Sequence, residues 1–308
     1  MIFSGSASRA FTENICDYLG VPMRVNNVIT FSEGNTYVKI GEKVRGMDVY
    51  IIQTIGLDPN NELVELLFWL DAFKRSGVHS ITAIIPFFSY SKADKKDEPR
   101  VSIRARVCAD CLEIAGVDRV VTMDLHSPQI QGFFRKPVDH LYAAGIFCDY
   151  IRGMGLENYV IASPDEGFAK NARYYAKRLG VPLAIGSKQR VSHNEHAEIL
   201  GIIGDVEGKT AIIVDDFTIS CVTLAETAKL LKSKGAKDVY AFVSHLLLSG
   251  KGADTLNRSL ITRLYATDTV DNPNAKNSDK VEIISVTDLF AKAIKAIHEY
   301  DSISELFD

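Results

Sequence analysis

The 308-residue sequence contains no tract rich in lysine and arginine, and its net charge is only −4. Binding to the phosphate backbone of nucleic acid requires clustered basic side chains, so we do not expect a nucleic-acid partner. No apolar run approaches the roughly 20 residues needed to span a bilayer. The first residues also lack the basic and long apolar regions of a signal peptide. We therefore expect no membrane partner either.

Cysteine is scarce as well, with five scattered residues. This odd number without a regular spacing fits a reducing compartment and predicts a cytoplasmic protein. Cys108 and Cys111 form a C-x-x-C pair, but they lie within a helical pattern, and no second pair of zinc ligands exists. We interpret the pair as part of a buried helix face and not as a zinc site.

One unit recurs four times along the chain: an amphipathic helix, a glycine and a run of β-branched residues. The four glycines are Gly77, Gly116, Gly180 and Gly235. Each is expected to end its helix in a left-handed conformation. Helices that alternate with continuous apolar strands indicate a parallel sheet covered on both faces. We therefore predict two similar doubly wound α/β domains, residues 1–143 and 144–308, with the last residues forming a terminal helix.

The segment 211–224 is the most informative part of the sequence. Its first four residues are apolar and predict a buried strand, and Asp215 and Asp216 follow directly. A short loop rich in hydroxyl groups comes next, and a helix is expected from residue 224. Ligands of open α/β sheets bind beyond the carboxyl ends of the strands, and the start of a helix suits a phosphate group. Carboxylates can accept hydrogen bonds from sugar hydroxyls or help to bind Mg²⁺. The segment predicts a phosphorylated sugar as ligand.

Several further segments resemble the ribose-phosphate pyrophosphokinase family. The most specific is L-E-I-A-G-V-D-R-V-V-T-M-D-L-H-S-P-Q-I-Q-G-F-F at 112–134. N-E-L-V-E-L-L at 61–67, I-T-A-I-I-P-F-F-S-Y at 81–90 and I-A-S-P-D-E-G at 161–167 support it. The resemblance covers essentially the whole chain. It implies a phosphoribosyltransferase type of fold in both domains, with the ATP side in the first and the sugar-phosphate side in the second.

The resemblance also implies an activity. The enzyme would transfer the diphosphoryl group of ATP to the anomeric hydroxyl of ribose 5-phosphate, with Mg²⁺ as cofactor and AMP as the second product. Such a transfer requires positioning of the reactants and neutralisation of charge on the transferring group. Family members assemble from dimers into larger rings, so a homo-oligomer is expected.

Residue roles follow from the same resemblance. Lys188 and Arg190 match the catalytic lysine and arginine of the family. His126 matches a histidine associated with Mg–ATP, and Asp165 an aspartate that holds a metal or ribose. The residues implied in ATP binding are Phe31, Glu33, Asn35, Lys92, Asp94 and His126. Those implied in ribose 5-phosphate binding are Asp215, Asp216, Thr218, Ser220, Cys221 and Thr223. The simpler alternatives are a surface role for His126, a helix cap for Asp165 and a hairpin-turn position for Phe31.

The sequence departs from the family pattern at several positions, and four of these departures support an alternative function. Ala93 replaces a glutamine, Phe168 a glycine, Ile219 an aspartate and Val222 a glycine. A β-branched residue strongly resists positive φ, so Val222 predicts an altered loop shape or another bound group. Two alternatives therefore stay open: a catalytically weak regulatory paralogue, and the same chemistry on another pentose phosphate.

Overall fold

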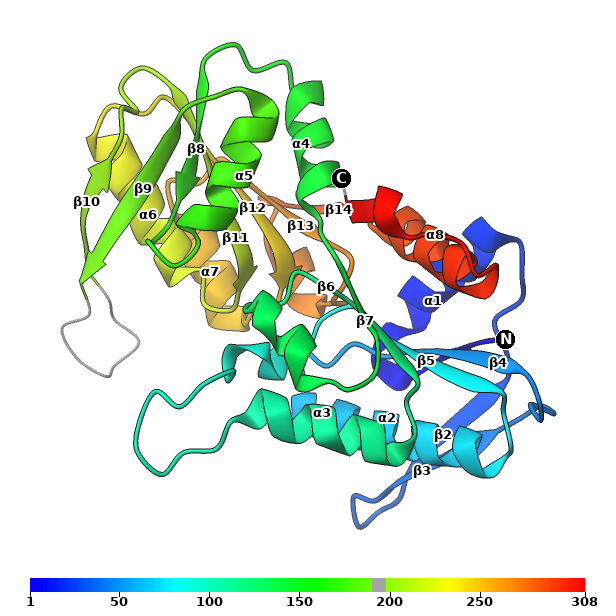
Figure 1. The fold of residues 1–308 in the computed structure, drawn as a ribbon. Helices are drawn as coiled ribbons and strands as arrows, with labels where there is room; N and C mark the ends of the chain where they lie inside the picture. The colour runs from blue at the N-terminus through cyan, green and yellow to red at the C-terminus, as the bar shows by residue number, and fades with distance from the viewer. Residues whose placement is uncertain (190–197, 308) are drawn as a thin grey trace. The chain divides into compact units, whose positions relative to one another are not determined.

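The computed structural model describes residues 1–189 and 198–307. They form two compact α/β units (Figure 1). Unit 1 consists of Met1–Tyr142, Thr269–Asp271 and Val286–Asp308, and unit 2 of Ala143–Asp268 and Asn272–Ser285. The predicted domain bounds, 1–143 and 144–308, stay a prediction.

Unit 1 is built on a parallel sheet in the order β1-β4-β5-β6-β7. The strands are β1 Ile2–Ser4, β4 Asp48–Ile52, β5 Ser80–Ile85, β6 Arg119–Met123 and β7 Val138–Leu141. One face carries α1 (Arg9–Leu19) and α8 (Thr287–His298), and the other carries α2 (Pro59–Arg75) and α3 (Arg104–Ala115) (Figure 1). A separate antiparallel hairpin joins β2 (Asn26–Thr30) to β3 (Thr36–Ile40). The chain ends in a short 3₁₀ helix, η5 (Ser304–Phe307). The buried rings of Trp69 and Phe73 on α2 stack on each other, and the ring of Phe3 on β1 packs against Phe73.

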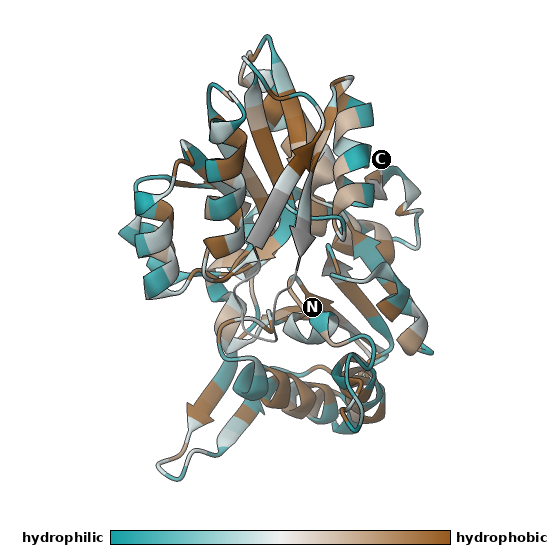
Figure 2. Ribbon diagram, turned by 90° about the vertical axis from the view of Figure 1, so that its left-hand side faces the viewer, coloured by the Kyte–Doolittle hydropathy of each residue, from teal (hydrophilic) through white to brown (hydrophobic). Residues whose placement is uncertain are grey.

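Unit 2 contains a seven-stranded sheet in the order β10-β9-β8-β11-β12-β13-β14. Its strands are β8 Tyr159–Ser163, β9 Leu183–Gln189, β10 Glu198–Ile203, β11 Thr210–Thr218, β12 Val239–Leu246, β13 Arg263–Thr267 and β14 Val281–Ile284. Only the edge strand β10 is antiparallel to its neighbour. The helices are α4 Ala144–Gly153, α5 Ala169–Leu179, α6 Val222–Ser233 and α7 Gly250–Arg258. Apolar residues concentrate on the strands between these helices (Figure 2).

The direction of the strand order reverses once in unit 2. From β8 the chain continues to β9 on one side, and β11 pairs with the other side of β8. The order in unit 1 runs from β1 to β7 without such a reversal among its described strands. Ligands of open α/β sheets bind at the carboxyl ends of strands where the order reverses. The topology therefore directs attention to the ends of β8 and β11.

The predicted repeat of helix, glycine and strand is confirmed at all four positions. Gly77, Gly116, Gly180 and Gly235 follow α2, α3, α5 and α6, with φ of +73°, +125°, +71° and +88°. Positive φ suits a residue without a Cβ atom, and it ends each helix so that the chain can return as a strand. The predicted α/β fold class is confirmed. No helix among the described residues has the length and apolarity that crossing a membrane would require.

Candidate functional site

Two aspartates lie where the strand order of unit 2 reverses. We expected the strand to end before Asp215, but β11 runs from Thr210 to Thr218, because Asp215 and Phe217 still pair with β12. The Asp216 N–H donates to Oδ1 of Asp215 at 3.0 Å, and the Phe217 N–H donates to Oδ1 of Asp216 at 2.9 Å. These local bonds leave both carboxylates with oxygens that can accept further hydrogen bonds.

The carboxylates at this edge repel one another. Desolvation raises the pKa of Asp215 well above its usual range, and the charges of Asp216 and Asp165 raise it further. Asp165 follows β8, the strand beside β11. A bound cation or several hydroxyl donors would relieve this repulsion, because both favour the charged carboxylate.

The loop after β11 turns at Cys221 and not at Val222. Cys221 has φ +56°, whereas Val222 is the first residue of α6. The expected conflict between Val222 and positive φ therefore does not arise, because the left-handed position falls one residue earlier. The Cys221 side chain is buried, and its Sγ lies 3.6 Å from Oγ1 of Thr218. Its thiol is thus not available to a ligand.

The left-handed position leads to a prediction on stability. Cys221→Val should lower the free energy of unfolding by about 1 kcal/mol, because valine adds the steric cost of β-branching to the left-handed strain that cysteine already bears. Cys221→Gly, the control, removes that strain. Urea unfolding followed by circular dichroism measures both variants. Equal stability of Cys221→Val and wild type would contradict the assigned conformation.

The backbone of this loop offers several open N–H donors. Among the described residues, no acceptor contacts the N–H groups of Ser220, Cys221, Thr223 or Leu224. The first intrahelical bond is donated by Ala225 to the carbonyl of Cys221 at 2.9 Å. Unpaired N–H groups at the start of a helix favour an anion through their partial positive charge. Ser220 and Thr223 add hydroxyl groups at the same turn.

The turns after β4 and β1 in unit 1 are both filled by protein groups. β4 takes the place of β11 in the sheet order, and after it the N–H groups of Gly56 and Asp58 donate to the buried Glu62 carboxylate at 2.5 and 3.1 Å. Every N–H from Gly5 to Ser8 has an acceptor: the carbonyl of Ile52 at 2.8 Å, Oε1 of Glu65 at 2.9 Å, Oε1 of Gln53 at 3.1 Å and the carbonyl of Gly5 at 3.3 Å. The buried Glu65 carboxylate also accepts from the hydroxyl of Ser6 and from Nε1 of Trp69. A side-chain anion thus occupies this turn, so it has no open donors for a ligand.

The loop after β8 places Asp165 beside the aspartate pair. Oδ1 of Asp165 accepts from the Phe168 N–H at 3.2 Å. This contact lies within the turn before the helix, because Phe168 and not Asp165 is the N-cap residue. The helix that follows is α5, which runs from Ala169 to Leu179. Gly186 of β9 packs against this loop so closely that an added Cβ would lie 2.5 Å from the carbonyl oxygen of Pro164. Gly186 could not be selected from the sequence, because it is needed for steric space and its φ is not positive.

The two residues expected to be catalytic lie at the end of β9 and beyond it. The backbone of Lys188 pairs with Ile199 in the antiparallel β9–β10 ladder. Arg190 lies outside the described residues. Their proposed roles therefore rest on the resemblance and on the position of β9 next to β8.

The residues implied in ATP binding belong to unit 1. Phe31, Glu33 and Asn35 occupy the turn of the β2–β3 hairpin, where the Phe31 N–H donates to the Asn35 carbonyl at 2.8 Å. The hairpin position of Phe31 is thus observed, and 47% of its surface is exposed. Its ring lies 6.1 Å from that of Tyr37. An exposed ring of this kind leaves one face open for stacking.

Two further loops of unit 1 carry the other candidates. Lys92 ends the 3₁₀ helix η2 (Ser89–Lys92), and Asp94 follows after the buried Ala93. His126 is exposed and lies three residues beyond β6, which ends earlier than expected, at Met123. The buried His140 accepts from the Leu125 N–H through Nε2 at 2.8 Å and so holds this loop. Its position on β7 gave no sequence signal for this supporting role.

The described residues contain no group of three or more His, Cys, Asp or Glu side chains that could hold a metal ion alone. Mg²⁺ is usually bound by one or two carboxylates together with waters and substrate phosphates. Asp165, the carboxylate predicted as a metal ligand, can serve in that arrangement, in which waters and substrate phosphates supply the other oxygens. Cys108 is buried and Cys111 is half-buried, and both are free thiols.

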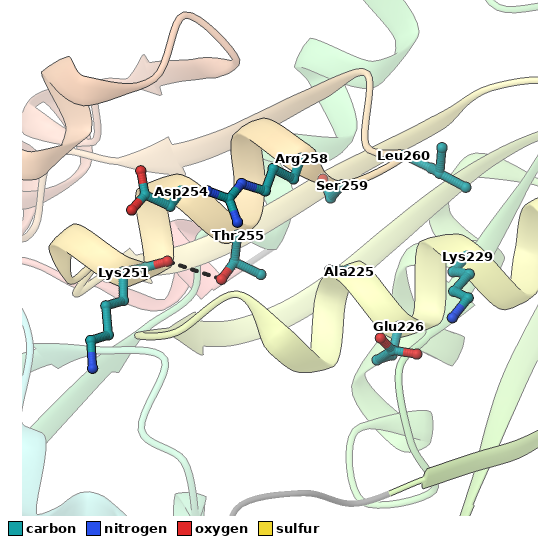
Figure 3. Close-up of a pocket in the computed structure, with 9 residues that line it drawn as sticks. All are labelled: Ala225, Glu226, Lys229, Lys251, Asp254, Thr255, Arg258, Ser259 and Leu260. Atoms are coloured by element: carbon teal, nitrogen blue, oxygen red, sulfur yellow. Dashed lines mark hydrogen bonds between the residues drawn. The ribbon is translucent and has the colours of Figure 1, made fainter.

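A groove of about 560 Å³ lies elsewhere on unit 2, between α6 and α7 (Figure 3). Its lining residues are Ala225, Glu226, Lys229, Lys251, Asp254, Thr255, Arg258, Ser259 and Leu260. None of the predicted site residues is among them. The charges of both signs at helical spacing are typical of a solvated helix surface. The candidate site is therefore the edge at β8 and β11 and not this groove.

The chain is similar to known proteins over nearly its whole length. Residues 1–116 match the family model of the N-terminal domain of ribose phosphate pyrophosphokinase, and residues 190–308 match that of the phosphoribosyl synthetase-associated domain. The chain is 45% identical over 307 residues to the ribose-phosphate pyrophosphokinase of Porphyromonas gingivalis, covering 99% of this chain and 97% of the relative. The Wolinella succinogenes protein of the same name is 44% identical over 306 residues, covering 99% and 98%.

A solved structure agrees with the fold of the whole chain. The phosphoribosylpyrophosphate synthetase from Mycobacterium smegmatis matches with a TM-score of 0.92 and 36% identity, covering 97% of this chain and 99% of that one. These findings define the class: an α/β protein with two parallel-sheet units of the phosphoribosyltransferase type. The chain belongs to the ribose-phosphate pyrophosphokinase family.

Proposed function

We propose that the chain transfers the β,γ-diphosphoryl group of ATP to the anomeric hydroxyl of ribose 5-phosphate, as its family membership implies. The anomeric oxygen attacks the β-phosphorus, the bond from that phosphorus to the oxygen bridging to the α-phosphate breaks, and AMP leaves. The hydroxyl proton is lost to solvent or base. The observation that carries the proposal is the open loop 218–224, with free N–H donors directly after the Asp215–Asp216 pair.

The sugar phosphate is assigned to unit 2. Its ring hydroxyls would donate to Asp215 and Asp216, and its 5-phosphate would accept from the N–H groups and hydroxyls of the loop, including Thr218, Ser220 and Thr223. Charge complementarity supports this orientation, because an anionic phosphate is disfavoured beside two carboxylates and favoured at the start of α6.

ATP and Mg²⁺ are assigned from the family and from charge. Mg²⁺ would supply neutralisation of phosphate charge, and Asp165 and His126 are the candidate ligands. Lys188 and Arg190 would contact the transferring oxygens, Lys188 as a point charge and Arg190 as a planar fork. Phe31, Glu33, Asn35, Lys92 and Asp94 would bind the nucleotide.

A homo-oligomer built from dimers is part of the proposal. The β2–β3 hairpin supports it, since Val25, Ile29, Phe31 and Tyr37 are each at least 45% exposed. Apolar side chains gathered on one ribbon favour a protein partner. Sedimentation velocity that found a monomer at micromolar concentration would contradict this part.

AMP release from ATP tests the activity. We expect release that depends on ribose 5-phosphate and that stops when EDTA removes the metal. A panel of other pentose phosphates runs alongside as the specificity control. Release with another pentose phosphate only would replace the substrate, and binding without any turnover would favour the regulatory paralogue.

A further inference from the structure

The segment that follows β12 holds the loop after β11. The Leu247 N–H donates to the Thr218 carbonyl at 2.9 Å, and the Ser249 N–H donates to the Ile219 carbonyl at 3.0 Å. Two consecutive carbonyls of the loop are thus fixed by a neighbouring connection. The Ile219 side chain is 44% exposed, so this residue is held by its backbone and not by burial.

Gly252 makes this contact possible. A Cβ atom built on Gly252 would lie 2.3 Å from the Ile219 carbonyl oxygen, closer than real Cβ contacts. The φ of Gly252 is not in the left-handed range, so glycine serves close approach at this position and not backbone conformation. The Gly252 N–H donates to Oγ of Ser249 at 3.0 Å, which caps α7 and keeps its first turn in place.

Gly250 provides a matched control within the same turn. It is the first residue of α7, its φ is also outside the left-handed range, and an added Cβ would meet nothing within 4 Å. Alanine at either position gains the same type of helix propensity. The two substitutions therefore differ in the clash with Ile219.

We propose that Gly252 is a positioning residue for the 5-phosphate of the sugar substrate. By admitting the Ile219 carbonyl against α7, it fixes the peptide that precedes the left-handed turn at Cys221. The free N–H groups of Ser220, Cys221 and Thr223 then have one fixed arrangement. This inference rests on the proposed function of the loop. It explains the fixed conformation of that loop by its contact with α7, a helix that is assigned no contact with the substrate.

Steady-state kinetics of Gly252→Ala and Gly250→Ala tests the proposal. For Gly252→Ala we expect the KM for ribose 5-phosphate to rise ~10-fold or more, about 1.4 kcal/mol of binding free energy. The KM for ATP should stay within about 2-fold, since the loop is assigned to the sugar only. Calorimetric titration with ribose 5-phosphate alone should show the same rise in Kd. Gly250→Ala should match wild type in all three values.

An unchanged KM and Kd in Gly252→Ala, or an equal rise of both KM values, would overturn the inference. If Gly252→Ala does not fold, Ser249→Pro and Ser249→Ala replace it. Both lose the hydroxyl cap, and only Ser249→Pro also loses the N–H to Ile219, with the Ser249 φ of −78° compatible with proline. Only Ser249→Pro should then raise the KM for ribose 5-phosphate. A wild type without ribose-dependent turnover or binding would contradict the proposed function itself.

Discussion

Lys188→Ala is expected to lower turnover at least ~100-fold, the scale of losing one charge contact made in the transition state. The transferring diphosphoryl group carries charge on several oxygens, and an ammonium group that meets them lowers the barrier. Because the contact forms mainly in the transition state, kcat should fall more than the KM values rise. Steady-state AMP formation at saturating ATP and ribose 5-phosphate measures the effect.

Two other variants make the Lys188 result specific. Lys188→Arg keeps the positive charge but places it on a planar guanidinium group, so we expect an intermediate turnover. Lys229→Ala removes an exposed lysine of α6 that makes no ion pair within the described part of the chain, and it should leave turnover unchanged. Near-normal turnover in Lys188→Ala would rule out its assigned role.

Asp215→Asn is expected to abolish most activity while stabilising the metal-free fold. The loss of activity follows from weaker hydrogen bonds to the sugar hydroxyls; bonds to charged groups contribute about 1.5–3 kcal/mol, so kcat/KM should fall roughly 10- to 100-fold. The stabilisation follows from the raised pKa of Asp215, which desolvation and the neighbouring Asp216 and Asp165 cause. A carboxyl group whose surroundings oppose its ionisation destabilises the folded state at pH values where it is charged.

The stability gain of Asp215→Asn should depend on pH. A carboxyl group whose pKa is raised on folding binds its proton more tightly in the folded state. Its unfavourable effect is therefore absent below the usual pKa of an aspartate and grows as the pH rises toward the raised value. In EDTA, the advantage of Asp215→Asn should be greatest at neutral pH and vanish in acid. A gain of about 1 kcal/mol would raise the Tm by roughly 2–4 °C.

Asp205→Asn is a control whose effect on stability should be opposite to that of Asp215→Asn. A hydrogen bond from Lys209 lowers the pKa of Asp205, an exposed carboxylate of the same unit. Asp205→Asn should therefore slightly destabilise the protein at neutral pH, and its effect should fade as the pH falls. If Asp215→Asn lost stability at neutral pH like this control, the repulsion assigned to the three carboxylates would be wrong.

Local patterns in the sequence were sufficient for much of the fold. The four glycines that end helices were recognisable because a left-handed C-terminal position is a local requirement, and all four have positive φ. The predicted strain at Val222 is absent, since the turn places the left-handed residue at Cys221. A comparison of single positions with the family pattern could not show this shift by one residue.

The residues that support the site were hidden for a different reason. Gly252, Gly186 and His140 act on backbone groups that are distant in sequence: the carbonyls of Ile219 and Pro164, and the N–H of Leu125. Steric space and hydrogen-bond partners of this kind exist only after folding. A glycine needed for close approach therefore looks, in the sequence, like any other glycine.

The kind of chemistry could be inferred before the fold was known, because the Asp215–Asp216 pair, the hydroxyl-rich loop and the family segments are local strings of residues. The tertiary structure decided which of the two similar units carries the open loop. In unit 1 Glu62 fills the turn after β4, the strand that takes the place of β11, whereas in unit 2 the strand order reverses and the N–H groups after β11 stay open. The physical reason is that an anion site requires unpaired donors, and pairing is a property of the folded chain.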